Sequence, residues 1–376
     1  MPEVRDVLER QMDRTPIEPI TVEAFFRRRD SLLRRRRITA AVVAIAVAVA
    51  ATGLAVHAFD RAQGAVPALP PPRAGSIVFV GRGSAWAPTD NGSVYVYDPA
   101  SGNVSKLLDL SCTQDAAGHR SCPGVRVNGV AASPDGTRFV YSLAESHPDT
   151  VSDTTWTMTD AVGLHVLDLR SGRSTRIVPC APPSCSEIGS VAWSPNGTTI
   201  AYTIDRLDGA SIQLVDPDGS NDRALDVGLA DARDPAWSPD SSRIAFSAMP
   251  SHGPQVPTLF ETAICCDTRE LILGHTQRSG SAPAWSPAGT SLAYVQGEGG
   301  PTGSVWVLRT ESGIATRVES LGVAEQSTPA WSPDGSRIAV ISNGRLLLVD
   351  PDGGTTTVLT KAWSRVGPVF YPGGSW

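Results

Sequence analysis

The segment AWSPDGSRIAVI, from Ala330 to Ile341, decides the fold because variants of it recur along the chain. The other four copies are ASPDGTRFVYS, AWSPNGTTIAYT, AWSPDSSRIAFS and AWSPAGTSLAYV, which begin at Ala132, Ala192, Ala236 and Ala284. Their prolines stand at positions 134, 195, 239, 287 and 333. Repeats of roughly 40 to 50 residues are typical of propeller blades.

Each copy predicts two strands joined by a tight turn. Ser-Pro-Asp-Gly supplies the preferred residues of a type I turn, with proline fixing φ at the second position. An alternating strand such as Arg243–Ser247 follows the turn, and a second hairpin ends at Asp216–Gly219 or at Asp350–Gly353. Four antiparallel strands per repeat make one blade. The tryptophans at the same place in four successive repeats are expected to fill the wedge between neighbouring blades: Trp193, Trp237, Trp285 and Trp331.

The two ends of the repeat region complement each other. The segment Phe370–Gly374 (FYPGG) matches the strand end and turn of the repeat, and no second strand follows it. The segment Gly75–Val80 reads as a second strand that lacks its first. Pairing of the C-terminal and N-terminal strands would complete one blade and leave no open sheet edge round the ring. We therefore predict an all-β fold, a six-bladed β-propeller over residues 75–376.

The repeat resembles a known family. The W-S-P-D-G-x-x-I-A-F phrase followed by L-V-D-x-D-G is similar to the TolB-type propeller repeat, also called PD40, and the resemblance covers Gly75 to Trp376. It implies a six-bladed propeller that is often used for protein binding and sometimes gates substrate entry in serine peptidases. TolB itself carries an extra α/β domain before its propeller, so its lipoprotein partner cannot be carried over. The peptidase relatives need a hydrolase domain, for which this chain has no room.

An apolar stretch near the N-terminus predicts a membrane anchor. Residues Ile38 to Val56 carry no charge, and as a helix they would reach about 28 Å, close to the hydrocarbon thickness of a bilayer. Arg27–Arg29 and Arg34–Arg37 precede this stretch, which by the positive-inside rule keeps the N-terminus cytoplasmic and places the propeller outside the cell membrane. A cleaved signal peptide and a buried core helix are the alternatives. The expected domains are a cytoplasmic Arg-rich leader (1–37), a transmembrane helix (38–58), a Pro-rich linker (59–74) and the propeller (75–376).

The sequence contains no recognisable catalytic or cofactor motif. With 32 Lys and Arg against 38 Asp and Glu, the net charge of -6 gives no general nucleic-acid footprint. The G-x-S-x-G, H-E-x-x-H and phosphate-loop patterns are all missing. The carboxylates of Asp216, Asp218 and Asp222 alternate as in a calcium loop, but Gly219 is misplaced for one, and we interpret the segment as a hairpin turn. No enzyme activity, metal or cofactor is predicted.

Six cysteines suit an oxidising exterior. Two local disulfides are predicted, Cys112 with Cys122 and Cys180 with Cys185, and a zinc site made from all four cysteines is the alternative. The adjacent Cys265 and Cys266 lie at the hairpin joining the outer strands of the fourth blade. They form either a vicinal disulfide or two free thiols.

The lengths of the connections indicate which face binds. Connections from strand one to strand two and from strand three to strand four are tight turns, which open on one face. The connections on the other face are long: 109–128, 143–163, 179–189, 248–257 and 320–328. Long loops in a compact fold are usually functional or disordered. The candidate binding residues on this face are His119, Arg120, His147, Asp149, Asp153, Trp156, Asp231 and Arg233; any one of them is alternatively a solvated loop residue.

We therefore expect a single-pass membrane protein whose external propeller binds a protein or cell-envelope ligand. The alternative is transmembrane signalling of the anti-sigma type, with the propeller as the sensor. In that case the leader would dock a cytoplasmic partner such as a sigma factor, whereas otherwise its helix would lie on anionic headgroups.

Overall fold

The structure is a computed structural model, and most of the residues that it describes belong to the propeller. The chain divides into two units, Met1–Gly64 and Ala65–Trp376. The structure describes residues 72, 75–81, 93–110, 113–114, 120–123, 125–145, 154–157, 162–252, 256–264, 266–271, 279–297, 302–324, 328–342, 345–354, 356–361 and 369–370. The predicted leader and transmembrane helix lie outside these residues, as does nearly all of the linker, so their boundaries stay predictions. In the part of the chain that is described, no helix is long and apolar enough to cross a bilayer.

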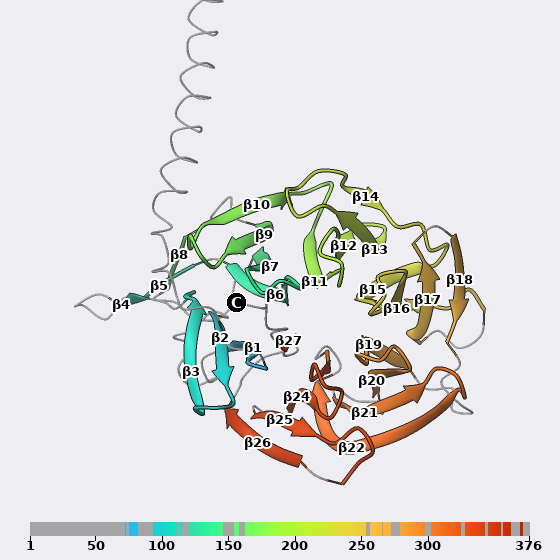
Figure 1. The fold of residues 1–376 in the computed structure, drawn as a ribbon. Helices are drawn as coiled ribbons and strands as arrows, with labels where there is room; N and C mark the ends of the chain where they lie inside the picture. Colours follow the sequence, from blue (N-terminus) through green and yellow to red (C-terminus); the bar gives the residue numbers. More distant parts are fainter. Residues whose placement is uncertain are drawn as a thin grey trace, which may run out of the picture. The chain divides into compact units, whose positions relative to one another are not determined.

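The described strands form six blades arranged as a ring (Figure 1). Blade one contains β1 (Ile77–Gly81), β2 (Ser93–Asp98), β3 (Asn103–Leu108) and β27 (Val369–Phe370). Blade two contains β6 (Val125–Ala132), β7 (Arg138–Glu145), β9 (Gly163–Asp168) and β10 (Ser174–Pro179). Blade three contains β11 (Glu187–Trp193), β12 (Ile200–Arg206), β13 (Gly209–Val215) and β14 (Arg223–Ala224). Blade four contains β15 (Ala230–Trp237), β16 (Arg243–Met249), β17 (Thr258–Ala263) and β18 (Cys266–Glu270). Blade five contains β19 (Gly280–Trp285), β20 (Ser291–Gly297), β21 (Thr302–Arg309) and β22 (Ile314–Ala324). Blade six contains β23 (Ala330–Trp331), β24 (Ile338–Ser342), β25 (Arg345–Val349) and β26 (Thr356–Lys361).

Blade one is built from both ends of the propeller region, as predicted. β27 pairs antiparallel with β1, with Phe370 opposite Ile77 and Val369 opposite Val78. β1 in turn pairs with β2 over its whole length. Ring closure by the C-terminal strand is therefore confirmed. The turn expected after Phe370 lies outside the described residues.

Blades five and six share a strand, which corrects one predicted loop. β22 continues past blade five, and Val323 near its end lies opposite Ser342 of β24 in blade six. β23 then pairs with β24 further along. Part of the expected connection 320–328 is therefore strand, because the outer strand of one blade runs directly into the inner strand position of the next.

The Ser-Pro-Asp-Gly turn is held by its own side chains. The Oγ atom of Ser332 donates to Oδ1 of Asp334 at 2.6 Å and accepts the backbone N–H of Arg337 at 2.9 Å. The N–H of Gly335 donates to the carbonyl oxygen of Ser332 at 2.9 Å. Gly335 has a φ of +72°, which glycine adopts without a steric cost. The repeated phrase therefore specifies the turn through bonds within six residues.

The repeated tryptophans fill the space between blades, as predicted. Trp237 packs among apolar side chains of blades three and four, and Trp285 packs against blade four. Nε1 of Trp237 donates to the carbonyl of Ala192 in the preceding blade at 3.2 Å. The guanidinium of Arg243 lies over the ring of Trp285, 5.2 Å from its centroid, which adds a cation–π attraction between blades.

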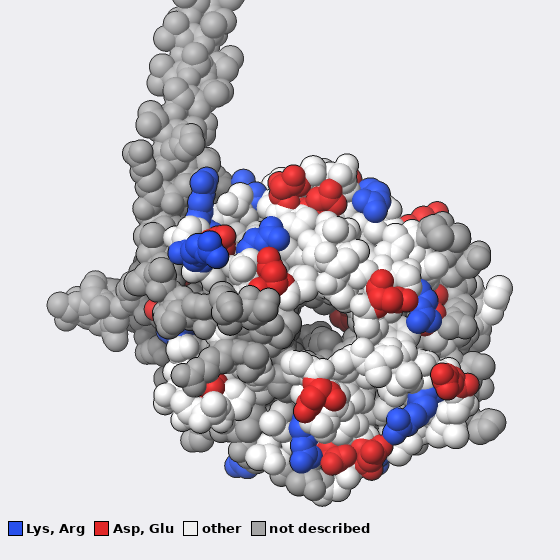
Figure 2. Space-filling view, in the orientation of Figure 1, with Lys and Arg blue, Asp and Glu red and all other residues white. Residues whose placement is uncertain are grey.

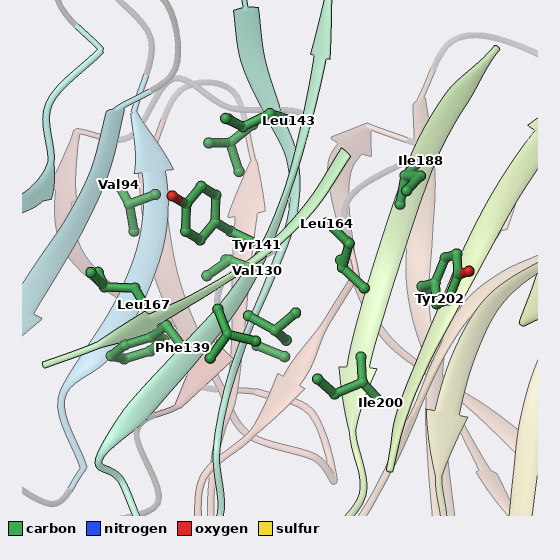
Figure 3. Close-up of a cluster of buried hydrophobic side chains, with 14 of the residues drawn as sticks. Val94, Val130, Phe139, Tyr141, Leu143, Leu164, Leu167, Ile188, Ile200 and Tyr202 are labelled. Atoms are coloured by element: carbon green, nitrogen blue, oxygen red, sulfur yellow. The ribbon is translucent and has the colours of Figure 1, made fainter. Parts of the chain in front are cut away.

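The largest apolar cluster joins blades one, two and three (Figure 3). Val94 of β2, Phe139 of β7 and Ile200 of β12 are almost completely buried within it. Tyr141 and Tyr202 belong to the same cluster and occupy the same place in their repeats. Burial between sheets, and not within any one sheet, therefore holds the blades in the ring.

We predict that Trp237→Ala destabilises the propeller by about 3–5 kcal/mol, because it removes a buried aromatic side chain and leaves a cavity between blades three and four. Trp237→Phe keeps most of the apolar volume and loses the bond to Ala192, so its effect should be clearly smaller. Urea unfolding followed by tryptophan fluorescence measures both changes. Equal effects of the two variants would contradict the wedge role.

We predict that the Ser-Pro-Asp-Gly turns make stability depend on acid pH. Hydrogen bonds from the Ser238 side chain and the Ser242 backbone and side chain hold the pKa of Asp240 at about 2. Bonds from Ser332 and Ser336 do the same for Asp334, whose pKa is also about 2. The unfolded value is about 3.9, so this stabilisation is present above pH 4 and is lost as the pH falls toward 2.

The control for this prediction is provided by blade three. Asn196 replaces the aspartate there, and its Oδ1 still accepts from Ser194 at 2.7 Å and from the N–H of Thr198 at 3.1 Å. The double variant Asp240→Asn, Asp334→Asn should therefore fold and lose less stability between pH 5 and pH 2 than the unmodified chain. Urea unfolding at a series of pH values measures this slope, and an unchanged slope would show that these carboxylates are not its source.

Candidate functional site

The antiparallel order of each blade gives the ring two different faces. The turn face carries the Ser-Pro-Asp-Gly turns and the hairpins between the third and fourth strands, such as Asp350–Gly353. The loop face carries the connections between the second and third strands and those from blade to blade. Figure 2 shows one face of the ring with its central opening, and acidic and basic side chains are distributed round the ring on this face. The predicted site lies on the loop face.

Two of the long connections on the loop face come together as a small sheet. Strands β4 (Thr113–Gln114), β5 (Arg120–Pro123) and β8 (Thr154–Thr157) form a three-stranded sheet in the order β4-β5-β8. The β5–β8 pairing is parallel, with Arg120 opposite Thr154 and Cys122 opposite Trp156. The segments expected as loops are therefore strands in part. Threonine and tryptophan are favoured in strands, so the composition of Thr154–Thr157 was a signal for β8.

The structure places four of the eight predicted site residues. Arg120 and Trp156 lie two register positions apart on paired strands of the small sheet. Asp231 and Arg233 lie on β15, the inner strand of blade four. The other four lie outside the described residues: His119, His147, Asp149 and Asp153.

Arg233 of blade four forms an ion pair with Asp205 of blade three. Its Nη2 lies 2.6 Å from Oδ1 of Asp205, and its Nη1 donates to Oδ2 of the same carboxylate at 3.0 Å. Oδ1 of Asp231 lies 3.6 Å from the same guanidinium and also accepts the N–H of Ala210 at 3.1 Å. The Arg233 side chain is 44% exposed. Its pairing with Asp205 links the two blades, and part of its side chain stays exposed at the loop face.

A second inter-blade pair at the loop face was not predicted. Nη2 of Arg126 on β6 lies 3.0 Å from Oε1 of Glu187 on β11. Asn128 donates to the same carboxylate and, at 3.2 Å, to the carbonyl of Ile188. The partners are separated by about sixty positions in the sequence, so no local pattern could have identified the pair.

Hydroxyl groups and one carboxylate link the inner strands of blades three and four. Oδ1 of Asp234 accepts from Ser190 and its Oδ2 accepts from Ser247, both at 3.0 Å. The N–H of Asp234 donates to Oγ1 of Thr203 at 3.2 Å. Asp234 has a φ of +55° and stands where β15 departs from regular register. Both oxygens of this carboxylate accept hydrogen bonds from neighbouring strands, so its role is structural.

A projecting hairpin tip and a disulfide lie beside these pairs. Leu207, at the turn from β12 to β13, is 89% exposed. Nε of Arg206 donates to the carbonyl of Ser184 at 3.1 Å, which ties the tip to the connection between blades two and three. That connection contains the predicted disulfide Cys180–Cys185, with a Cα–Cα distance of 5.1 Å. This bond is not compatible with the alternative four-cysteine zinc site.

The other cysteine predictions lie outside what the structure describes. Cys112 and Cys265 are not among the described residues, and neither are the side chains of Cys122 and Cys266. In the described part of the chain, no group of three or more His, Cys, Asp or Glu side chains is arranged to hold a metal ion.

The segment with alternating aspartates is a hairpin turn, as interpreted from the sequence. The N–H of Gly219 donates to the carbonyl of Asp216 at 2.9 Å, and the N–H of Asp216 donates to the carbonyl of Ser220. The Ser220 hydroxyl donates to Oδ1 of Asp218 at 2.6 Å, and this bond is the main cause of a lowered pKa of Asp218. These carboxylates therefore close the turn between β13 and β14.

Comparison with known proteins supports the propeller type. Residues 208–362 match the family model described as TolB beta propeller domain. The crystal structure of TolB from Acinetobacter baumannii is similar with a TM-score of 0.60 at 16% identity, over 79% of this chain and 66% of that one. A protein described as TolB from Agrobacterium tumefaciens gives 0.54 at 15% identity, over 80% and 95%. A chain of a nidogen/laminin complex gives 0.54 at 14% identity, over 79% and 98%.

A search of curated protein sequences finds no match. This chain spans about two thirds of the Acinetobacter TolB chain, and at these identities the structural likeness shows the fold alone. The fold, the ring closure and the matched repeats nevertheless agree with one another. The ring formed by this chain therefore has the β-propeller fold of the TolB structures, and its residues 208–362 match the TolB propeller family.

Proposed function

We propose that this chain is a membrane-anchored, extracytoplasmic propeller that binds a protein or cell-envelope ligand on its loop face. The uncharged run Ile38–Val56, preceded by clustered arginines, supports the anchor and its orientation. TolB-type propellers are suited to protein binding, and one similar structure is of a nidogen/laminin complex. The expected absence of enzyme activity stays a prediction from the sequence.

The single observation that carries the binding proposal is the difference between the two faces. On the turn face, the polar side chains of the short hairpins form hydrogen bonds within the same turn, as in the Asp216 and Ser332 turns. On the loop face, Leu207 is 89% exposed next to Arg206 in the sequence, the Arg233 side chain is 44% exposed, and two long connections add a further sheet. Apolar side chains bordered by arginine are typical of protein interfaces.

The disulfide supports the proposed compartment in addition to the predicted anchor. The Cys180–Cys185 bond closes a short connection whose sulfur-bearing side chains are both buried. Structural disulfides persist mainly in oxidising compartments. An external propeller would be exposed to such conditions.

We predict that a photo-crosslinking amino acid at position 207 of the full-length chain forms a discrete adduct in intact cells that naturally produce it. The matched control is position 314 on the turn face, where Ile314 is also an exposed apolar residue at 61%. Immunoblotting after irradiation should show the adduct for position 207 only. An adduct at 314 alone, or at both positions equally, would exclude the loop face as the specific surface.

We predict that the membrane segment determines the thiol state of the propeller. In the full-length chain, Cys180 and Cys185 should resist alkylation in intact cells until a reductant is added. In a chain without Ile38–Val56, retained in the cytoplasm, glutathione should keep both thiols free. Mass spectrometry of peptides from the alkylated chains measures this difference, and free thiols in the full-length chain would contradict the external location.

A further inference from the structure

Three blades carry a buried tyrosine at the same place in the repeat. Tyr141, Tyr202 and Tyr294 are each at most 2% exposed. The hydroxyl of Tyr141 forms a hydrogen bond with Oγ of Ser174 at 2.6 Å, and that of Tyr202 donates to Oδ1 of Asp222 at 2.7 Å. The hydroxyl of Tyr294 has no hydrogen-bond partner among the described residues.

The strand register explains the difference. Tyr141 lies opposite His165, and Ser174 lies opposite Leu167, two positions further along the same strand. In blade five, Tyr294 lies opposite Trp306, and the residue opposite Leu308, two positions further along, is Ala315. A methyl group therefore stands in blade five where blade two has a hydroxyl.

Other buried polar atoms gather on the same side of blade five. Both Oε1 and Nε2 of Gln296, which is 1% exposed, lack a partner among the described residues. Gln296 follows Tyr294 by two positions on β20, so both side chains lie on one side of the sheet. Nε1 of Trp306 and Nε1 of Trp285 are also unpartnered within the described part. By contrast, Nε1 of Trp331 donates to the carbonyl of Ala284 at 3.1 Å.

This side of blade five faces blade four. Tyr294 and Trp285 pack with Leu259 of blade four in one apolar cluster. Arg243 of blade four lies over Trp285 and also pairs with the buried Glu261 at 3.0 Å. The unpartnered polar atoms therefore lie at a closed interface with a charged pair already inside it.

We propose that the interface between blades four and five binds ordered water. One water molecule forms a hydrogen bond with the Tyr294 hydroxyl, in the place where the Ser174 hydroxyl bonds Tyr141 in blade two. Buried polar groups in native proteins are almost always bonded, and internal waters commonly make about three hydrogen bonds. Tyr294, Trp306, Trp285 and the Gln296 amide supply mainly donors, with Oε1 of Gln296 as an acceptor. Each water accepts only two bonds and donates two, so these donors require more than one water molecule.

The chemistry of these groups disfavours a metal ion or an anion at this interface. Indole N–H groups donate only and do not bind metal ions. An anion would meet the Glu261 carboxylate, which lies in the same interface and is 4% exposed. Burial raises the pKa of Tyr294 well above its usual range, so the phenol stays protonated and continues to donate.

Thermal unfolding of the full-length chain tests whether the Tyr294 hydroxyl is bonded. Tyr294→Phe should lower Tm by about 1–4 °C, as the loss of one satisfied hydrogen bond does. Tyr202→Phe, which loses the bond to Asp222, is the matched control and should act in the same direction. A rise in Tm for Tyr294→Phe with a fall for Tyr202→Phe would show an unbonded hydroxyl and overturn the proposal.

Counting long-lived internal waters separates water from a protein partner. Oxygen-17 magnetic relaxation dispersion on the full-length chain should show at least one fewer such water in Ala315→Ser, whose hydroxyl replaces the water as Ser174 does in blade two. Tyr294→Phe should also reduce the number, and Tyr202→Phe should leave it unchanged. Unchanged numbers in both Ala315→Ser and Tyr294→Phe would overturn the proposal.

Discussion

The pairing of β27 with β1 is the constraint on which the rest of the structure depends. Each blade buries its apolar surface only against the blades on either side, so an open ring would expose the flanks of its first and last sheets. Two register positions, Ile77 with Phe370 and Val78 with Val369, bring the chain ends into one sheet. Ile77 and Val78 are completely buried, and they can be so only when blades two and six both stand beside blade one. The backbone bonds of a short strand therefore allow the side-chain packing of the whole ring.

Features specified by neighbouring residues could be predicted from the sequence, and features specified by distant ones could not. The Ser-Pro-Asp-Gly turn depends on bonds such as that between Ser332 and Asp334, two positions apart, so its sequence defines it. The tryptophan wedge follows because the same residue recurs at each repeat. The parallel pairing of β5 with β8 joins two separate connections between regular strands, and no repeat or period indicates it. The extension of β22 into blade six depends equally on the place where the next blade lies.

The candidate site shows the same limit. The loop face could be identified from connection lengths, because antiparallel topology alone assigns each connection to a face. The role of Arg233 could not, because Asp205, which occupies its guanidinium, belongs to another blade. Arg126 and Glu187 were missed for the same reason. A charged residue on an inner strand has two roles open to it, pairing with the next blade or facing a ligand, and only the packed ring distinguishes them.

The position of β1 within its sheet has a mechanical consequence. β1 lies between β27 and β2, so it is an interior strand although it begins the propeller. In the proposed anchored arrangement, tension between the membrane and a bound ligand would enter the ring at Ile77. That load would be spread over hydrogen bonds on both sides of β1, whereas an edge strand would peel from a single neighbour. The tether would thus pull on the ring through an interior strand, not through a free edge.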